Sequence, residues 1–250
     1  MKLIPASDSS LLVLFGDTVS PEHHSRVIGL FRALQARQDP RIRNLHPAYA
    51  SLLIDFDPLR STSEELIAIV EKLAEPFAEQ PAEQPAEQPV QRPALAGDSA
   101  VAPRANVVTV PVCYDVEFAP DLLDVSQRAR LSVDEIIRLH SSPTYLVYFL
   151  GFSPGFAYLG GLPELLHMPR HSTPRISVAA GSVGIAGSQA GIYPVDSPGG
   201  WRLIGRTPLR MFDAEATPPA RLQPGDRLKF SPINRATFDE ILRSSAAGLA

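Results

Sequence analysis

The sequence predicts a small α+β domain followed by a mainly-β barrel domain, and three observations support this fold class. Within residues 1–77, short apolar runs alternate with segments of helical periodicity, which favours a sheet packed against helices. Residues 78–105 are rich in Ala, Glu, Gln and Pro and break this pattern. Over residues 106–240, glycine and proline separate many short apolar runs, which is typical of a closed barrel of short strands.

The N-terminal domain is predicted to contain one sheet with two helices on one face, a small ferredoxin-like sandwich. The apolar run at residues 11–15 predicts a buried strand, and residues 49–56 predict another. Ser20 before Pro21 indicates a helix start, because serine caps a helix and proline fits its first turn. Residues 61–64, with the sequence S-T-S-E, predict a capping box that opens a second helix.

Residues 78–105 are predicted to be a linker. The tetrapeptide Ala-Glu-Gln-Pro occurs three times in succession over residues 78–89, and such repeats bury little and keep the backbone extended. A proline-rich docking segment is the alternative, but no P-x-x-P core with flanking basic residues supports it.

The barrel domain is expected to open with a strand at residues 107–112, although this strand could instead complete the sheet of the first domain. Ser132 and Glu135 predict a capping box for a short helix that ends near His140. Apolar, β-branched and aromatic residues predict strands at residues 144–150 and 227–230.

Composition excludes several classes of partner and site. The net charge is −4 and only three lysines occur, so neither nucleic acid nor an anionic membrane is an expected partner. The single cysteine, Cys113, lies in an apolar run and is interpreted as a buried thiol; no second cysteine is present for a disulfide or a metal site. No apolar run is long enough to span a bilayer, and we expect a cytoplasmic protein.

The sequence lacks the common signatures of a self-contained catalyst. It contains neither G-x-x-x-x-G-K-[ST] nor H-E-x-x-H. These absences favour a role that depends on partner subunits.

The most informative stretch is a series of motifs rich in glycine, proline and aromatic residues. They are residues 118–122 (FAPDL), 151–159 (GFSPGFAYL), 180–187 (AGSVGIAG), 191–194 (GIYP), 197–201 (SPGGW), 204–207 (IGRT) and 224–226 (PGD). Together they resemble the family of the sporulation kinase inhibitor KipI and allophanate hydrolase subunit 1, many of whose members are assigned as the B-type subunit of 5-oxoprolinase.

The resemblance implies that the barrel is cyclophilin-like and that the chain is one subunit of an ATP-dependent 5-oxoprolinase. Such an enzyme opens 5-oxoproline to L-glutamate, and the subunit would be inactive alone. The implied partners are a paralogous cyclophilin-like subunit and a third subunit. ATP with Mg²⁺ would be used in the assembled complex rather than held tightly by this chain. Two alternatives within the family are an inhibitor of a sensor histidine kinase and a subunit of allophanate hydrolase.

Arg175 and Arg206 are candidate site residues because each lies in a motif otherwise made of glycine, proline and apolar residues. Arginine in such a setting usually has an anionic partner, and its planar fork suits the carboxylate of 5-oxoproline. We assign Arg175 to substrate binding and Arg206 to catalysis. An internal salt bridge is the alternative for each.

Tyr158, Gln189 and Tyr193 carry donors that could polarise the lactam oxygen. We assign Gln189 to catalysis and the two tyrosines to substrate binding, with a purely structural role as the alternative for each. Ser197 and Trp201 flank a Pro-Gly-Gly turn whose glycines could let a substrate approach the backbone. Both are therefore candidate substrate-binding residues, unless the turn serves only to position Trp201.

His140 is a candidate general base, although its place at a helix end also suits an imidazolium that caps the helix dipole. No histidine has a carboxylate at ligand spacing, so we expect no metal site.

Overall fold

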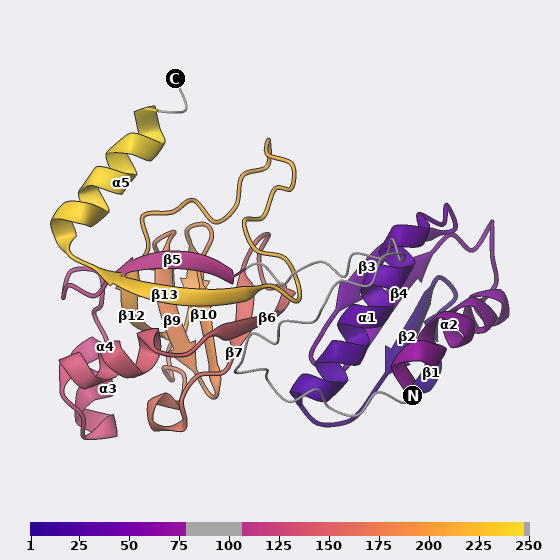
Figure 1. The fold of residues 1–250 in the computed structure, drawn as a ribbon, viewed down its shortest axis with the longest axis horizontal. Coiled ribbons are helices and arrows are strands. Elements are labelled where there is room, and N and C mark those ends of the chain that lie inside the picture. Colours follow the sequence, from indigo (N-terminus) through magenta and orange to yellow (C-terminus); the bar gives the residue numbers. More distant parts are fainter. Residues whose placement is uncertain (79–106, 248–250) are drawn as a thin grey trace, which may run out of the picture. The chain divides into compact units, whose positions relative to one another are not determined.

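The computed structural model describes residues 1–78 and 107–247 of the 250-residue chain. These residues belong to two compact units, Met1–Arg104 and Ala105–Ala250, which we call the N-terminal unit and the barrel unit (Figure 1). Each unit has a hydrophobic core of its own. Except for its first residue, the predicted linker at residues 78–105 lies outside the described residues.

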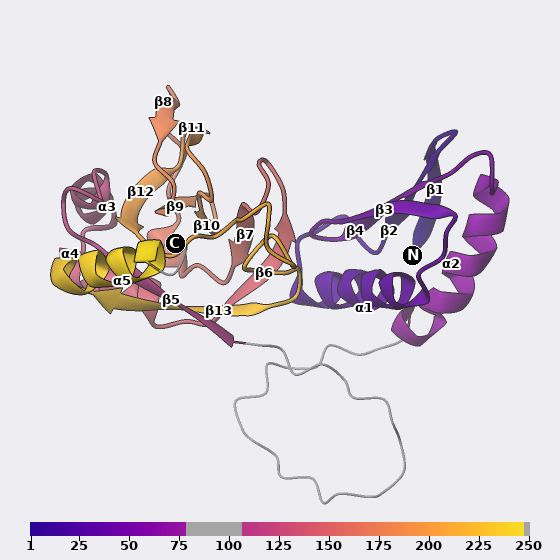
Figure 2. The same cartoon turned by 90° about the horizontal axis from the view of Figure 1, so that it is seen from above.

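In the N-terminal unit, four antiparallel strands form one sheet with the order β1-β2-β4-β3. Alternate residues of β2 and β4 are buried, so one face of the sheet packs against both helices (Figure 2). The elements are β1 (Lys2–Ser7), β2 (Ser10–Leu14), α1 (Pro21–Arg37), β3 (Ile42–Pro47), β4 (Ser51–Phe56) and α2 (Ser63–Ala78).

The order of elements, ββαββα, differs from the βαββαβ order of the ferredoxin-like domain that we expected. The additional element is β1, which the sequence did not predict because its residues are exposed and show no alternation of apolar and polar side chains. Strand β1 lies at the sheet edge, where Pro5 is tolerated.

The helix starts follow the expected capping chemistry, with one shift. The Ser20 side chain accepts a hydrogen bond from the backbone N–H of His23, as predicted for the start of α1. At α2 the capping box is one residue later than predicted. Glu65 N–H donates to Thr62 Oγ1, and Thr62 N–H donates to a Glu65 carboxylate oxygen, each at 3.4 Å.

The barrel unit is a closed barrel with the strand order β10-β7-β6-β13-β5-β12-β9. Neighbouring strands are antiparallel except β5 and β13, which run parallel. Its strands are β5 (Val107–Cys113), β6 (Tyr145–Leu150), β7 (Ala157–Gly160), β9 (Ser182–Ala186), β10 (Gln189–Ile192), β12 (Arg202–Arg206) and β13 (Arg227–Ile233). The expected barrel is confirmed, and β5 belongs to it rather than to the first sheet.

Three helices accompany the barrel: α3 (Leu122–Ala129), α4 (Val133–Ser141) and α5 (Arg235–Ala247). The capping box of Ser132 and Glu135 at the start of α4 is confirmed. Helix α5 was not predicted, and it continues beyond the expected domain end at residue 240. None of the described helices combines the length with the apolar character that crossing a bilayer requires.

A short two-stranded ribbon, made of β8 (Arg175–Val178) and β11 (Ser197–Gly199), lies outside the barrel sheet and is visible at the top of the barrel unit in Figure 2. Both strands come from the motif-rich stretch, and they carry two of the predicted site residues, Arg175 and Ser197.

Candidate functional site

The register of the ribbon places Arg175 and Ser197 near a cluster of aromatic side chains. Arg175 pairs with Gly199, and Val178 pairs with Ser197. Paired residues on adjacent strands project to the same face, and Val178 is buried on that face. Its hydrophobic neighbours are Phe156, Ala186, Tyr193, Trp201 and Leu203. Ser197 therefore faces this cluster, and Arg175 lies near enough for its charge to act on Tyr193.

The aromatic cluster, which we call the Tyr193 cluster, consists of Phe152, Phe156, Tyr158, Tyr193 and Trp201. Its rings meet edge to face: the Phe156 centroid lies 5.2 Å from that of Tyr193 and 5.4 Å from that of Trp201. The Trp201 and Tyr158 centroids are 5.8 Å apart. Offset and edge-to-face pairs are the favoured geometry for aromatic rings. The structure thus brings together three of the predicted binding residues.

Motif glycines make this close packing possible. A Cβ atom at position 191 would lie 2.9 Å from both Phe156 and Trp201, and one at position 199 would overlap the Tyr193 hydroxyl. Gln189 and Gly191 occupy alternate positions of β10 and so project to the same face. Gln189 therefore lies at the edge of the Tyr193 cluster, as the prediction of a shared site requires.

Arg175 is held by the buried carboxylate of Asp121. Arg175 Nη2 donates to Asp121 Oδ1 at 2.7 Å, and His171 Nε2 lies 3.0 Å from the same oxygen. The other oxygen, Oδ2, accepts the backbone N–H of Leu203 at 2.7 Å. The internal salt bridge left open for Arg175 therefore exists. Its Nη1 atom is nevertheless buried and has no hydrogen-bond partner within the described residues.

Arg206 occupies a different environment from Arg175. Its Nε donates to the backbone oxygen of Ala180 at 2.8 Å, and its guanidinium lies 5.7 Å from the centroid of the Phe118 ring. These contacts place Arg206 beside the turn that precedes β9 rather than in the Tyr193 cluster. The structure therefore does not bring Arg206 together with the predicted substrate-binding residues.

His140 is enclosed in the barrel core. Its side chain has no exposed surface, its ring stacks on Phe230 with the centroids 4.4 Å apart, and its Nδ1 is hydrogen-bonded to the Tyr114 hydroxyl at 2.7 Å. Burial lowers the pKa of His140 to about 3, so the ring is neutral at neutral pH and does not act as a charged cap of the helix dipole. A general base must reach its substrate, and this placement gives His140 no access to one.

The sequence analysis did not single out two residues of this region: Asp121, which binds Arg175, and Phe152, which belongs to the Tyr193 cluster. Asp121 belongs to the motif at residues 118–122, where an acidic residue between apolar neighbours could have been recognised as the partner of a buried arginine. Phe152 is 63% exposed and has a φ of 64°, a left-handed conformation that is rare for a bulky residue. No sequence signal reveals this conformation.

The Tyr193 hydroxyl stays protonated, and the charges of Arg170 and Arg175 act on it. Burial raises the pKa of Tyr193, while a hydrogen bond from the Trp201 backbone and the charges of Arg170 and Arg175 oppose part of that rise. Within the described residues, no group of three or more His, Cys, Asp or Glu side chains is placed to hold a metal ion.

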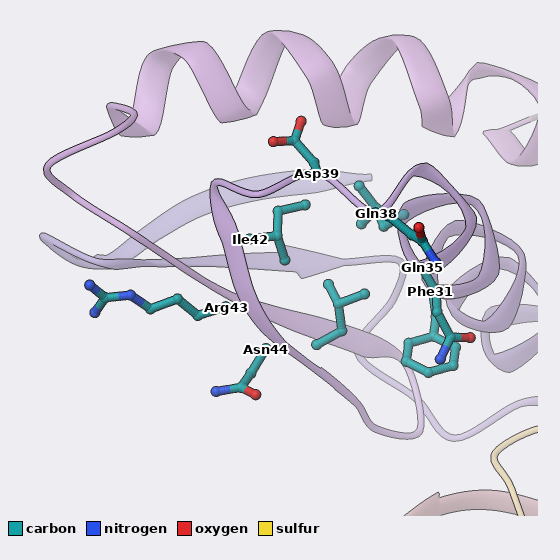
Figure 3. Close-up of a pocket in the computed structure, with 9 residues that line it drawn as sticks. Phe31, Gln35, Gln38, Asp39, Ile42, Arg43 and Asn44 are labelled. Atoms are coloured by element: carbon teal, nitrogen blue, oxygen red, sulfur yellow. The ribbon is translucent and has the colours of Figure 1, made fainter. Parts of the chain in front are cut away.

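A shallow pocket of about 320 Å³ occurs in the N-terminal unit (Figure 3), and its two charged side chains, Asp39 and Arg43, have internal partners. Asp39 accepts hydrogen bonds from Arg41 Nη2 at 2.7 Å and from Arg41 Nε at 2.9 Å, and these bonds lower its pKa. Arg43 forms an ion pair with Asp57 at 3.2 Å. This arrangement stabilises the turn before β3, and we do not place the functional site there.

Comparison with known proteins relates the chain to one family and to several named relatives. Residues 1–222 match the family described as carboxyltransferase domain, subdomain C and D. The chain is 36% identical to the B-type subunit of 5-oxoprolinase from Bacillus subtilis over 231 residues, which cover 92% of each chain. It is also 36% identical to the corresponding 5-oxoprolinase subunit of Haemophilus influenzae, covering 92% of this chain and 97% of the relative.

Solved structures share the fold. A crystal structure of TTHA0988 superimposes with a TM-score of 0.75 at 34% identity, covering 91% of this chain and 40% of that chain. A conserved uncharacterised protein from Pyrococcus horikoshii matches over its whole length at 42% identity, with a TM-score of 0.53. The urea carboxylase of Kluyveromyces lactis, at 18% identity and a TM-score of 0.65, shares the fold alone.

Proposed function

Because the chain belongs to the family described as carboxyltransferase domain, subdomain C and D, we propose that it is a subunit of an ATP-dependent 5-oxoprolinase. The observation that carries this proposal is its 36% identity to two relatives named as 5-oxoprolinase subunits of the B type, across 92% of its length. The proposed reaction is hydrolysis of the lactam C–N bond of 5-oxoproline, which yields L-glutamate.

The proposed partners are a paralogous barrel subunit and a third subunit, without which this chain is inactive. The match to TTHA0988 supports a unit that works with others, because the similar region makes up only 40% of that chain and is joined there to further polypeptide. ATP and Mg²⁺ are proposed to act in the assembled complex. This chain has no G-x-x-x-x-G-K-[ST] motif, and we assign none of its residues to the nucleotide.

The proposed substrate site on this chain is the Tyr193 cluster with its ribbon. Tyr158 and Trp201 supply apolar surface for the lactam ring, and Arg175 and Ser197 supply hydrogen-bond donors for the carboxylate. Tyr193 and Gln189 are donors for the lactam oxygen, on which negative charge develops during hydrolysis. His140 and Arg206 are left out of this site because their contacts lie elsewhere.

Reconstitution tests the proposal. The purified chain is mixed with its two candidate partners, and the ATP-dependent loss of 5-oxoproline is compared with that in mixtures lacking one protein. Activity that requires all three proteins is the expected result. If the three proteins form a complex that leaves 5-oxoproline intact, the enzymatic proposal is wrong, and inhibition of a histidine kinase becomes the function to assay.

A further inference from the structure

We propose that the barrel unit binds the carboxylate of a small cyclic carboxylic acid through Arg175 Nη1, Ser197 Oγ and Ser153 Oγ, beneath a movable wall formed by Phe152. The identity of the acid as 5-oxoproline rests on the proposed function, but the site itself does not. Neither Ser153 nor Phe152 was among the residues that the sequence singled out.

The first argument is that these polar atoms are buried and lack partners. Among the described barrel residues, four buried side-chain nitrogen or oxygen atoms have no hydrogen-bond partner: these three atoms and His140 Nε2. Buried polar atoms in folded proteins are nearly always hydrogen-bonded, so each exception requires an explanation. Arginine N–H and serine hydroxyl groups are all donors, and an ionised carboxylate accepts only. A carboxylate would satisfy all three together.

The second argument is that the segments that carry the three groups meet at one side chain, Tyr193. The Tyr193 hydroxyl lies against Gly199, which is the cross-strand partner of Arg175. Ser197 is the cross-strand partner of Val178, which belongs to the same buried cluster as Tyr193. On the other side, the Tyr193 ring lies 6.4 Å from the ring of Phe152, the residue before Ser153. Arg175 and Ser197 therefore come to Tyr193 from the ribbon, and Ser153 belongs to the β6–β7 loop whose Phe152 ring contacts Tyr193 from the other side.

The third argument is that Arg175 is fixed before any ligand arrives. Asp121 is only 5% exposed and binds Arg175, His171 and the backbone of Leu203 at the same time. Arg175 Nη2 is thereby occupied, and Nη1 is the nitrogen left for another acceptor. Arg170, whose guanidinium lies 5.8 Å from the centroid of the Trp201 ring, adds a second positive charge nearby. Arg170 and Arg175 carry two positive charges and Asp121 carries one negative charge, so the net charge of these three groups is positive and favours an anion.

The three donor atoms are buried, so a ligand can reach them only if part of the protein moves. Phe152 is the central residue of a tight turn in which Ser153 N–H donates to Gly151 O at 2.7 Å. A γ-turn with positive φ is strained, and strained residues concentrate at sites that bind ligands. The ring of Phe152 is also largely exposed. In the proposed site this ring, which packs against Phe156 and Tyr193, is the part that moves when the ligand enters.

Ligand binding to the isolated full-length chain tests the site without requiring catalysis. The probes are 5-oxoproline and 2-pyrrolidinone, the same lactam ring without the carboxylate, and their affinities are measured by calorimetry or by NMR titration. We expect 5-oxoproline to bind at least tenfold more tightly than 2-pyrrolidinone. Equal affinities, or no binding of 5-oxoproline, would show that the three donors hold only water and would overturn the proposal.

Three substitutions locate the binding. Arg175→Met should weaken 5-oxoproline binding about tenfold or more, as expected for a charge-assisted contact. Arg128→Met is the matched control, because Arg128 also pairs with a carboxylate but lies on the exposed face of α3, and it should bind as the unaltered chain does. If Arg175→Met fails to fold, Ser153→Ala leaves the Asp121 pair intact and should weaken binding roughly fivefold, the contribution of one hydrogen bond. Unchanged affinity in Ser153→Ala would contradict the site.

The binding and reconstitution experiments fail in distinguishable ways. If 5-oxoproline binds and Arg175→Met abolishes binding while the complete mixture shows no turnover, the carboxylate site stands and the enzymatic proposal falls. If the mixture turns over 5-oxoproline and Arg175→Met leaves its KM unchanged, the enzymatic proposal stands and the carboxylate site is wrong.

Discussion

Two clusters of aromatic side chains in the barrel unit contain polar groups, yet they differ in how those groups are satisfied. Around His140, the rings of Tyr114, Tyr145 and Phe230 are all buried, and both tyrosine hydroxyls hydrogen-bond to His140, of which only Nε2 lacks a partner within the described residues. The Tyr193 cluster reaches the surface through Phe152, and three donors beside it lack partners within the described residues. The two clusters therefore differ chiefly in access, because only the Tyr193 cluster combines unpartnered donors with an exposed ring.

Burial has a different consequence in each of the two clusters. Around His140, burial excludes water and keeps the imidazole neutral, which stabilises the core. Around Tyr193, burial covers donors that have no internal acceptor, which costs stability unless a ligand or water supplies one. Variants that remove polar groups should therefore behave differently in the two clusters. Trp201 is the only tryptophan of the chain and is buried, so its fluorescence reports unfolding of the barrel unit.

The largest effect is expected from Asp121→Ala, which removes the group that organises the Tyr193 side of the barrel. Asp121 is buried and binds two side chains and one backbone N–H, so its loss leaves Arg175 as an unpaired, partly buried charge. Breaking such a pair typically costs about 3–5 kcal/mol. Urea unfolding followed by Trp201 fluorescence measures the change in free energy of unfolding.

The matched control for Asp121→Ala is Asp239→Ala. Asp239 also accepts from an arginine, Arg235, but its side chain is 43% exposed. Exposed ion pairs contribute about 0–1 kcal/mol, so the control should unfold nearly as the unaltered chain does. Similar losses in both variants would mean that Asp121 is an ordinary surface partner and does not organise the site.

The second-largest loss of stability is expected at the His140 cluster, and it occurs only when the pH is lowered. The folded-state pKa of His140 is about 3, while an unfolded histidine titrates near 6.5. Below pH 6.5 the unfolded chain binds a proton that the folded chain does not accept until pH 3 is approached. Stability should therefore fall as the pH decreases through this window, by roughly 1 kcal/mol per pH unit from this group.

A double variant isolates the contribution of His140 from that of the carboxylates. Replacing both partners, Tyr114→Phe with His140→Phe, leaves no orphaned hydroxyl and should be tolerated at pH 7. Its stability should decline less steeply between pH 6 and pH 4 than that of the unaltered chain. Parallel pH profiles for the two proteins would show that His140 is not buried in its neutral form.

The sequence predicts the fold better than the site because the two depend on different signals. Helix starts at Ser20 and Ser132 were predictable from local capping chemistry, and the barrel from short apolar runs between turn residues. Strand β1 was not, because an exposed edge strand has no buried face to impose alternation. The burial of His140 was not predictable, because a buried histidine and an accessible one can have the same neighbours in sequence. The pairing of Asp121 with Arg175 spans 54 positions, and no local pattern encodes it.

The smallest effect on stability, and the sharpest test of the comparison, is expected from Phe152→Gly. Glycine adopts a φ of 64° without the steric penalty that phenylalanine incurs, which offsets the loss of a ring that is already 63% exposed. We expect the free energy of unfolding to change by less than about 1 kcal/mol. Phe156→Ala, which removes a fully buried ring of the same cluster, should cost about 3–5 kcal/mol. If Phe152 is a wall for a ligand, Phe152→Gly should weaken 5-oxoproline binding while leaving the Trp201 unfolding curve almost unchanged. A loss of stability equal to that of Phe156→Ala would instead make Phe152 part of the core, and the strained turn would then serve folding rather than binding.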